Sequence, residues 1–263
     1  MGAERVPVLM YHRVDPAADD PALCVAPRRF AAQMRWLADH GYRPCSHAAF
    51  RDWYLGQTEL PPLAVLLTFD DGYAGLHEHV LPVLAARGWP ATVFLVSALI
   101  GAHDRWAAGG DARGGPRALL GRAQIEEMAR HGFEFQSHSR THADLTTLDA
   151  AALHEQIAGS RRELEDLLGR AVDGFAYPYG RFDDAAHAAV ERAGYRIAFS
   201  VRSGFNRPGG ERFAVRRLDI TGADTRTRFG RKVAMGSNDG SWQGRLRYLA
   251  ARLRGAGREA ARA

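Results

Sequence analysis

The chain has 263 residues, of which 46% are hydrophobic and 25% charged, a composition typical of a folded globular protein and not of a disordered chain, a collagen-like fibre or a disulfide-rich miniprotein. The formal net charge of +5 is compatible with anionic partners. Only Lys232 among the 35 basic residues is a lysine, so genomic base composition explains the arginine excess better than a selected basic surface, and no nucleic-acid partner is expected.

Short apolar runs alternate with amphipathic stretches from the start of the chain. In the first hundred residues, the apolar runs predict strands at residues 6–11, 63–69 and 92–96. Apolar residues at helical spacing predict helices at residues 27–40, 46–55 and 73–87. The run at 63–69 is almost wholly apolar, as expected of a strand that is buried on both faces of a parallel sheet.

The same alternation continues after a glycine-rich, polar loop at residues 101–117. Helices are predicted at residues 122–130, 148–168 and 184–193. Further strands are predicted at residues 133–136, 175–177, 197–201 and 215–220. Regular alternation of strands and helices indicates an α/β fold with mainly parallel strands. The strand count favours a distorted (β/α)7-type barrel, with a doubly wound sheet as the alternative.

We expect residues 1–240 to form one catalytic domain and residues 241–263 to form a basic, helical C-terminal tail. The tail carries leucines at helical spacing among arginines, namely Leu246, Leu249 and Leu253. This pattern predicts peripheral contact with a membrane surface or docking on the domain.

Several features of the sequence predict the cellular compartment. No apolar run approaches the roughly 20 residues of a transmembrane helix, and no signal peptide is seen after Met1. Two cysteines, Cys24 and Cys45, need not be paired and fit a reducing compartment. We therefore expect a protein of the cytoplasm or of the inner face of the membrane, unless a leader has been removed.

Two adjacent carboxylates follow the apolar strand at residues 63–69. Asp70 and Asp71 are costly to desolvate at such a place unless cations or hydrogen bonds neutralise them. The same residues before Gly72 are equally compatible with a solvated turn or a helix N-cap.

Two histidines follow the predicted strand at residues 133–136. His138 and His142 are four residues apart, a spacing of one helical turn that lets both imidazoles reach one metal ion. Such a pair also arises by chance in a chain with 11 histidines. Because the carboxyl ends of parallel strands meet at one rim, the aspartates and the histidines are expected to face the same site. One Asp and two His would bind a metal and leave positions open for water and substrate.

Two further strand ends add polar groups to this rim. His12 follows the first strand, where a packing histidine is the alternative interpretation. Residues 175–180 (Phe-Ala-Tyr-Pro-Tyr-Gly) end another strand in a tight turn, whose backbone N–H groups are expected to point into the site.

The ordered combination of these segments resembles the polysaccharide deacetylase (nodulation-protein homology) family. Residues 68–73 (Thr-Phe-Asp-Asp-Gly-Tyr) and 137–142 (Ser-His-Ser-Arg-Thr-His) look like its first two motifs, and residues 175–180 are similar to the third. Residues 90–96 match the strand that usually follows the first motif. The segments at 8–12 and 216–220 resemble the domain ends of the exopolysaccharide-type members.

The resemblance implies roles for individual residues. Asp71, His138 and His142 would bind a divalent metal, which is zinc in our prediction, although cobalt, nickel and iron accept the same ligands. Asp70 would be the general base and the backbone N–H of Tyr179 would help to hold the oxyanion.

Two departures from the family pattern affect these roles. The arginine that supports the base in members with a longer third motif is replaced by Ala176, and Arg217 is our candidate for its role. No histidine follows His187, so the usual late acid histidine is absent. In exopolysaccharide-type members the first strand supplies the acid, and His12 matches that place.

The resulting hypothesis is a metal-dependent hydrolase that removes an N-acyl group, acetyl in the simplest case, from an amino sugar in a polysaccharide or glycan precursor. A non-sugar amide as substrate is one alternative. Another is a non-catalytic protein of the same fold that uses its basic tail on anionic lipid or nucleic acid.

Overall fold

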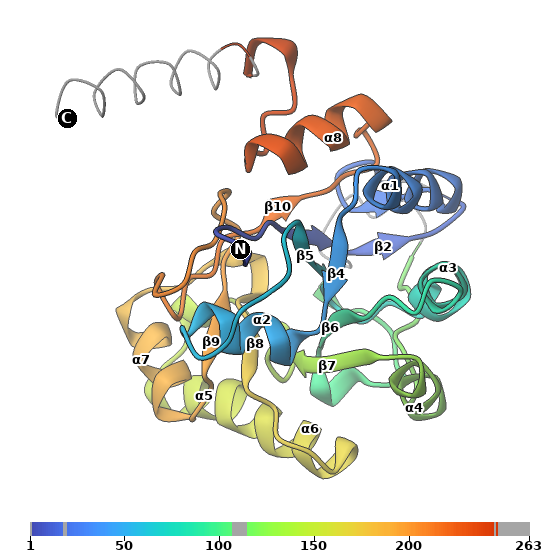
Figure 1. Cartoon of the computed structure of the whole chain (residues 1–263). Helices are drawn as coiled ribbons and strands as arrows, with labels where there is room; N and C mark the ends of the chain where they lie inside the picture. The colour runs from blue at the N-terminus through green and yellow to red at the C-terminus, as the bar shows by residue number, and fades with distance from the viewer. Residues whose placement is uncertain (1, 18–19, 107–114, 245, 247–263) are drawn as a thin grey trace, which may run out of the picture.

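The structure is a computed structural model that describes residues 2–17, 20–106, 115–244 and 246. A curled parallel sheet lies at its centre (Figure 1). Its strands follow one another in the spatial order β10 (Leu218–Asp219), β1 (Val8–Tyr11), β5 (Ala64–Phe69), β6 (Ala91–Leu95), β7 (Phe133–Ser137), β8 (Gly174–Ala176) and β9 (Ile197–Phe199).

The two edges of this sheet are joined by the chain that leads into β10. Phe199 of β9 forms a parallel bridge with Val215, and three residues later Leu218 pairs with Leu9 of β1. The strands therefore follow one another around the barrel in one direction, and the segment that leads into β10 connects the last strand, β9, back to β1. This arrangement confirms the distorted barrel and excludes the doubly wound sheet, in which the strand order reverses partway.

Alternating side chains divide the hydrophobic core into an inner and an outer part. Along β5, Ala64 and Leu66 belong to the inner cluster, whereas Val65 and Leu67 pack in the outer one. This alternation is the period of two expected of strands in a barrel. Helix α2 (His47–Tyr54) closes the amino-terminal end of the barrel with aromatic residues of the inner cluster, namely Phe50, Trp53 and Tyr54.

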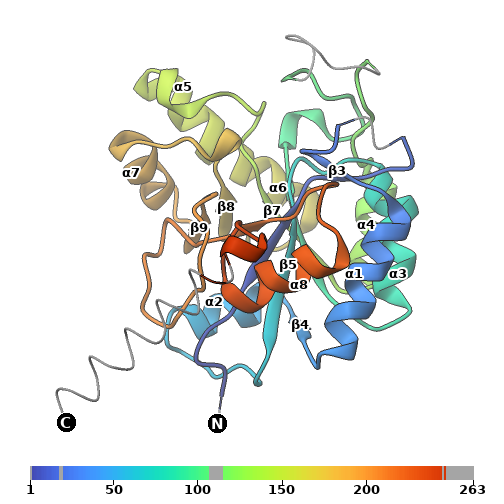
Figure 2. The same ribbon diagram turned by 90° about the horizontal axis from the view of Figure 1, so that it is seen from above.

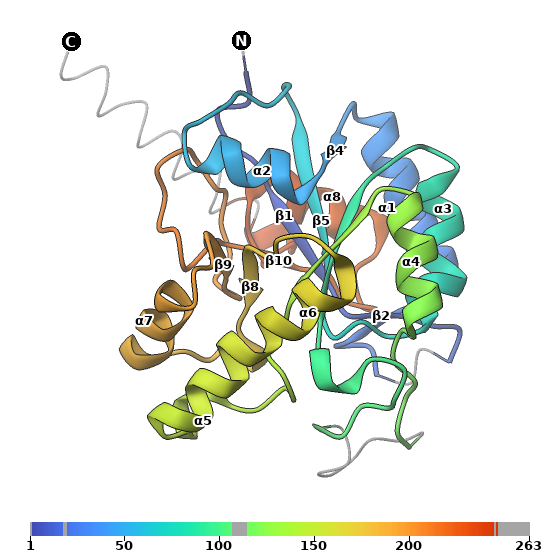
Figure 3. The ribbon, with the colours of Figure 1, turned by 90° about the horizontal axis from the view of Figure 1, so that it is seen from below.

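The remaining helices cover the outside of the sheet. They are α1 (Pro27–Asp39), α3 (Leu81–Ala85), α4 (Arg122–Arg130), α5 (Ala150–His154), α6 (Ser160–Leu168), α7 (Asp184–Arg192) and α8 (Arg226–Met235). Turns of π-helix precede α3 and join α5 to α6, so the predicted helices at 73–87 and 148–168 are present as continuous, shorter helical segments. In Figures 2 and 3, α1, α3 and α4 lie side by side on one flank, and α5, α6 and α7 lie on the other.

Four of the strands and α-helices in the described residues lie outside the predicted elements. Three are very short strands: β2 (Arg13–Val14) and β3 (Cys24–Val25), which form a separate parallel pair, and β4 (Arg43–Cys45), which runs parallel to the start of β5. The fourth is α8, which has four basic residues and an apolar face that includes Phe229 and Val233. Cys24 and Cys45 are both buried.

The boundary between domain and tail is not tested by the structure, because residues 245 and 247–263 lie outside the described part. Leu249 and Leu253 are among them. Trp242 lies over the guanidinium of Arg231 on α8. No helix in the described ranges is both long and apolar enough to cross a bilayer.

Candidate metal centre and active site

The period of two along the strands explains why the polar groups converge. In β5 the inward positions are even-numbered, and the next inward position beyond the strand end is Asp70. In β7, Phe133 and Phe135 pack in the outer cluster, so the next inward position is His138. In β1, Val8 faces inward and Leu9 outward, which places His12 inward in the same way. All three therefore lie at the carboxyl-terminal rim of the barrel.

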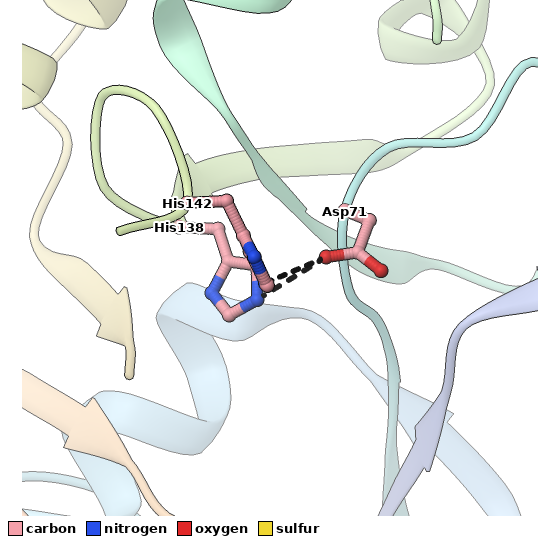
Figure 4. A group of neighbouring side chains, drawn as sticks. All are labelled: Asp71, His138 and His142. Carbon is pink, nitrogen blue, oxygen red and sulfur yellow. Dashed lines mark ion pairs between the residues drawn. The ribbon is translucent and has the colours of Figure 1, made fainter. Parts of the chain in front are cut away.

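Asp71, His138 and His142 form a compact, buried cluster (Figure 4). Oδ1 of Asp71 lies 3.4 Å from Nε2 of His138 and 3.3 Å from Nε2 of His142. One donor atom from each residue lies within 4.8 Å of the others. The three donors, one carboxylate oxygen and two imidazole nitrogens, are a set that suits zinc and related divalent ions.

The hydrogen bonds around this cluster leave a ring nitrogen and a carboxylate oxygen available to bind a cation. Nδ1 of His138 lies 2.8 Å from the carbonyl oxygen of Ala176 and donates its proton there, which leaves the lone pair of Nε2 in neutral His138 facing Asp71. Oδ1 of Asp71 is buried with no hydrogen-bond partner among the described residues. Burial raises the pKa of Asp71, but the two histidines beside it outweigh burial and hold that pKa well below its usual value.

The backbone around the cluster is strained. Asp71, Ser139, His142 and Tyr179 all have positive φ values, between 58° and 72°, which non-glycine residues rarely adopt and which costs about 1–3 kcal/mol each. The two histidines are therefore not one turn of helix apart, as their spacing suggested. Instead, a left-handed turn at Ser139 brings them together, and the hydroxyl of Ser139 accepts a 3.0 Å hydrogen bond from the N–H of His142.

Asp70 lies beside the cluster and pairs with a different partner. Both of its oxygens accept hydrogen bonds from the guanidinium of Arg217, at 2.6 and 2.9 Å, and both side chains are buried. Nε of Arg217 donates to the carbonyl oxygen of Ser200. Burial raises the pKa of Asp70, yet the charges of Arg217, His138 and His12 lower it overall, so this carboxylate is ionised at neutral pH.

His12 lies half-buried at the same rim as Asp70. Its charge acts on both Asp70 and Asp219, which shows that the three groups are neighbours. Nδ1 of His12 and Oδ1 of Asp219 are buried without hydrogen-bond partners in the described ranges. Burial raises the pKa of Asp219 against the charges of His12 and Lys232. The sequence analysis did not single out Asp219, although it lies two positions after Arg217 and so faces the same side of its strand.

Two aromatic rings flank His142. The ring of Tyr179 meets it edge-on at 4.5 Å, and the ring of Trp106 stacks on it at 4.2 Å. Tyr179 lies in the turn Pro178–Gly180, where the sequence placed a backbone donor, and its side chain is half-exposed. Trp106 comes from the loop after β6, and nothing in its sequence context distinguished it.

Comparisons with known proteins agree with this geometry. A model of the polysaccharide deacetylase family matches residues 57–198, more than half of the chain. A putative polysaccharide deacetylase of Bacillus subtilis (strain 168) is 27% identical over 227 residues, covering 86% of this chain and 75% of that protein. The poly-beta-1,6-N-acetyl-D-glucosamine N-deacetylase of Escherichia coli (strain K12) is 28% identical over 74% of this chain. The match spans only 34% of that longer protein.

Solved structures give the same result. The chain is similar to the Streptococcus pyogenes deacetylase PplD in complex with acetate, with a TM-score of 0.73 and 25% identity over 86% of this chain and 96% of that one. IcaB from Ammonifex degensii also has a TM-score of 0.73, with 26% identity over 89% of this chain and 97% of that one.

Proposed function

The chain belongs to the polysaccharide deacetylase family, and from this premise we propose that it is a metal-dependent hydrolase that removes an N-acetyl group from an amino sugar in a polysaccharide or glycan precursor. The observation that carries the proposal is the buried cluster of Asp71, His138 and His142 beside a second, separately paired carboxylate, Asp70. The names of the Escherichia coli and Staphylococcus aureus relatives support a poly-N-acetylglucosamine chain as the first substrate to test.

Asp71, His138 and His142 would hold the metal, zinc in our proposal. A divalent ion there would polarise the acyl carbonyl and lower the pKa of water. The orphaned Oδ1 of Asp71 and the free Nε2 face of His138 support this assignment.

Asp70 is proposed as the general base. An ionised carboxylate offers about four acceptor positions, and Arg217 occupies two of them, one on each oxygen. The remaining lone pairs can accept the proton of the attacking water. Arg217 holds the carboxylate plane fixed while the proton is transferred.

His12 is proposed as the general acid, and Tyr179 as an oxyanion donor through its backbone N–H. An amine leaves readily only after protonation, and His12 is close enough to Asp70 for its charge to lower the pKa of that carboxyl. A backbone donor aimed at the tetrahedral oxyanion typically contributes about 3–4 kcal/mol to the stability of the transition state.

The proposal is tested by acetate release from oligomers of N-acetylglucosamine, measured before and after treatment with a chelator and after re-addition of zinc. We expect release that is lost with the chelator and restored by zinc. Asp70→Asn, which keeps the proposed ligands, serves as the inactive control. Release that survives complete metal removal would exclude the metal-dependent mechanism. Metal binding without hydrolysis of any N-acyl sugar would favour a non-sugar amide substrate or a binding protein.

A further inference from the structure

His142 lacks the polar support that the other ligand histidine has. Nδ1 of His138 is fixed by the carbonyl oxygen of Ala176, whereas Nδ1 of His142 is buried with no hydrogen-bond partner in the part of the chain that the structure describes. Metal-binding histidines almost always donate their second N–H to an acceptor, because this bond fixes the orientation of the ring. Some other contact must therefore orient His142.

Among the described aromatic rings that contact His142, that of Trp106 has the shortest centroid distance. The two rings stack with centroids 4.2 Å apart and planes 29° apart. Stacking restricts rotation of the imidazole about its bond to Cβ, because a large rotation would drive the ring edge into the indole. Tyr179 touches the same ring edge-on, but half of its own side chain is exposed, so Tyr179 is the less constrained of the two neighbours.

Trp106 is itself held firmly. It packs on a small hydrophobic cluster that comprises Tyr73, Val96, Leu99 and Leu119. Two residues before it, the buried carboxylate of Asp104 accepts hydrogen bonds from the hydroxyl of Tyr73 at 3.1 Å and from the N–H of Arg117 at 2.9 Å. Tyr73 comes directly after the segment that carries Asp70 and Asp71. The indole therefore packs against Tyr73, which lies two residues after Asp71, the carboxylate of the proposed metal site.

We infer that Trp106 is a positioning residue that orients the His142 imidazole for metal binding by ring stacking, in place of the missing hydrogen bond at Nδ1. The inference rests on the proposed function, since it concerns one of the three proposed ligands. It adds a determinant of metal affinity that lies outside the motifs, in the loop between β6 and α4.

The test compares Trp106→Phe, which keeps a stacking ring, with Trp106→Leu and Trp106→Met, which keep apolar volume without one. Trp242→Leu is the control, because Trp242 contacts Arg231 and is 55% exposed. Zinc affinity is measured by competition with a chromogenic chelator, and ligand geometry by the visible absorption spectrum of the cobalt(II) form. Thermal unfolding of the metal-free proteins checks that each variant folds.

We expect Trp106→Leu and Trp106→Met to lose about 10- to 100-fold in zinc affinity, the usual effect of removing a group that orients a ligand, and to alter the cobalt spectrum. Trp106→Phe and Trp242→Leu should stay within about threefold of the original chain. Folded leucine and methionine variants with unchanged affinity and spectrum would overturn the inference while leaving the proposed function intact. If the original chain binds neither zinc nor cobalt, the proposed function fails first, and the inference with it.

Discussion

Adjacent carboxylates in this site have different partners, and that difference separates their proposed roles. Asp71 faces two imidazoles, whereas Asp70 accepts hydrogen bonds from both terminal nitrogens, Nη1 and Nη2, of the Arg217 guanidinium. Strand alternation places Asp70 inward, but it does not extend to Asp71, whose backbone has a positive φ of 72°.

We therefore predict that Asp70→Asn retains bound zinc and loses turnover, because an amide cannot take the water proton. His138→Ala and His142→Ala should lose zinc and activity together. Zinc content and acetate release are measured on the same preparations. Loss of zinc in Asp70→Asn together with its retention in Asp71→Asn would mean that the two carboxylate roles are reversed.

His12 is expected to matter only where the leaving group needs a proton. His12→Ala should slow amide hydrolysis by about 100- to 10,000-fold and leave zinc affinity nearly unchanged. An activated aryl acetate, whose leaving group needs no proton, should be affected much less. Rates on both substrates are compared at equal zinc content, and equal losses on both would assign His12 to packing or to metal binding.

Arg217 should set the acid limit of the reaction. The proposed base, Asp70, must be ionised to act, so the rate is expected to fall as the pH drops through its pKa. Without the guanidinium, burial dominates and raises that pKa, so Arg217→Met should move the acid limb of the pH–rate profile upward by about 1–3 units. Arg217→Lys keeps the charge without the paired hydrogen bonds and should fall between the two. A profile that stays in place in a folded Arg217→Met protein would contradict this role.

The sequence predicted the site residues at strand ends better than it predicted the residues that contact and orient them. Asp70, His138 and His12 follow from strand periodicity, because each is the next inward position after an apolar run. Trp106 and Asp219 do not, because their roles depend on contacts between segments far apart in the chain. Arg217 was selected only because the usual supporting arginine was missing, and its pairing with Asp70 depends on barrel closure.

At the level of elements, α8 shows where patterning fails. Its apolar face is short, and basic side chains dominate its sequence. The pattern therefore indicates a charged surface segment and not a helix that packs on the core. In the structure, Phe229 meets Trp36 of α1 edge-on at 5.6 Å. The only lysine in the chain, Lys232, is buried and donates to Asp224 and to the carbonyl oxygen of Asp219, both at 2.7 Å. Long, periodic elements such as α1 were predicted almost to the residue, whereas the two- and three-residue strands carry too few residues for a pattern.

The Lys232–Asp224 pair yields a prediction about stability. Lys232→Met leaves the fully buried Asp224 without its main partner, and such broken pairs typically cost about 3–5 kcal/mol of unfolding free energy. The double variant with Asp224→Asn should recover part of that loss, because the uncompensated charge is gone. Urea denaturation of both variants measures the difference. A single variant as stable as the original chain would show that Arg228, 3.7 Å from Asp224, suffices alone.

For the whole molecule, the tail is predicted to be separate from the chemistry. A chain that ends at Ser241 should keep its zinc affinity and acetate release, because the site residues all precede it. We also expect weak binding of the full chain to anionic vesicles through the basic, leucine-bearing segment. Sedimentation with vesicles compares the two chains: equal partition would exclude tail-mediated binding, and loss of activity on truncation would show that the tail is structural.

Barrel closure has a consequence for how the protein is made. His12 directly follows the first strand, while Arg217 lies 147 positions after Asp70 on the segment that joins the two sheet edges. In a nascent chain that still lacks this segment, Asp70 has no counterion. The edge of β1 that pairs with β10 in the complete sheet is also without its partner. The ribosome must therefore synthesise nearly the whole domain before Asp70, the proposed base, has the counterion that keeps it ionised when buried. Catalytic competence thus arrives late in synthesis, and fragments cut before Arg217 are expected to be inert.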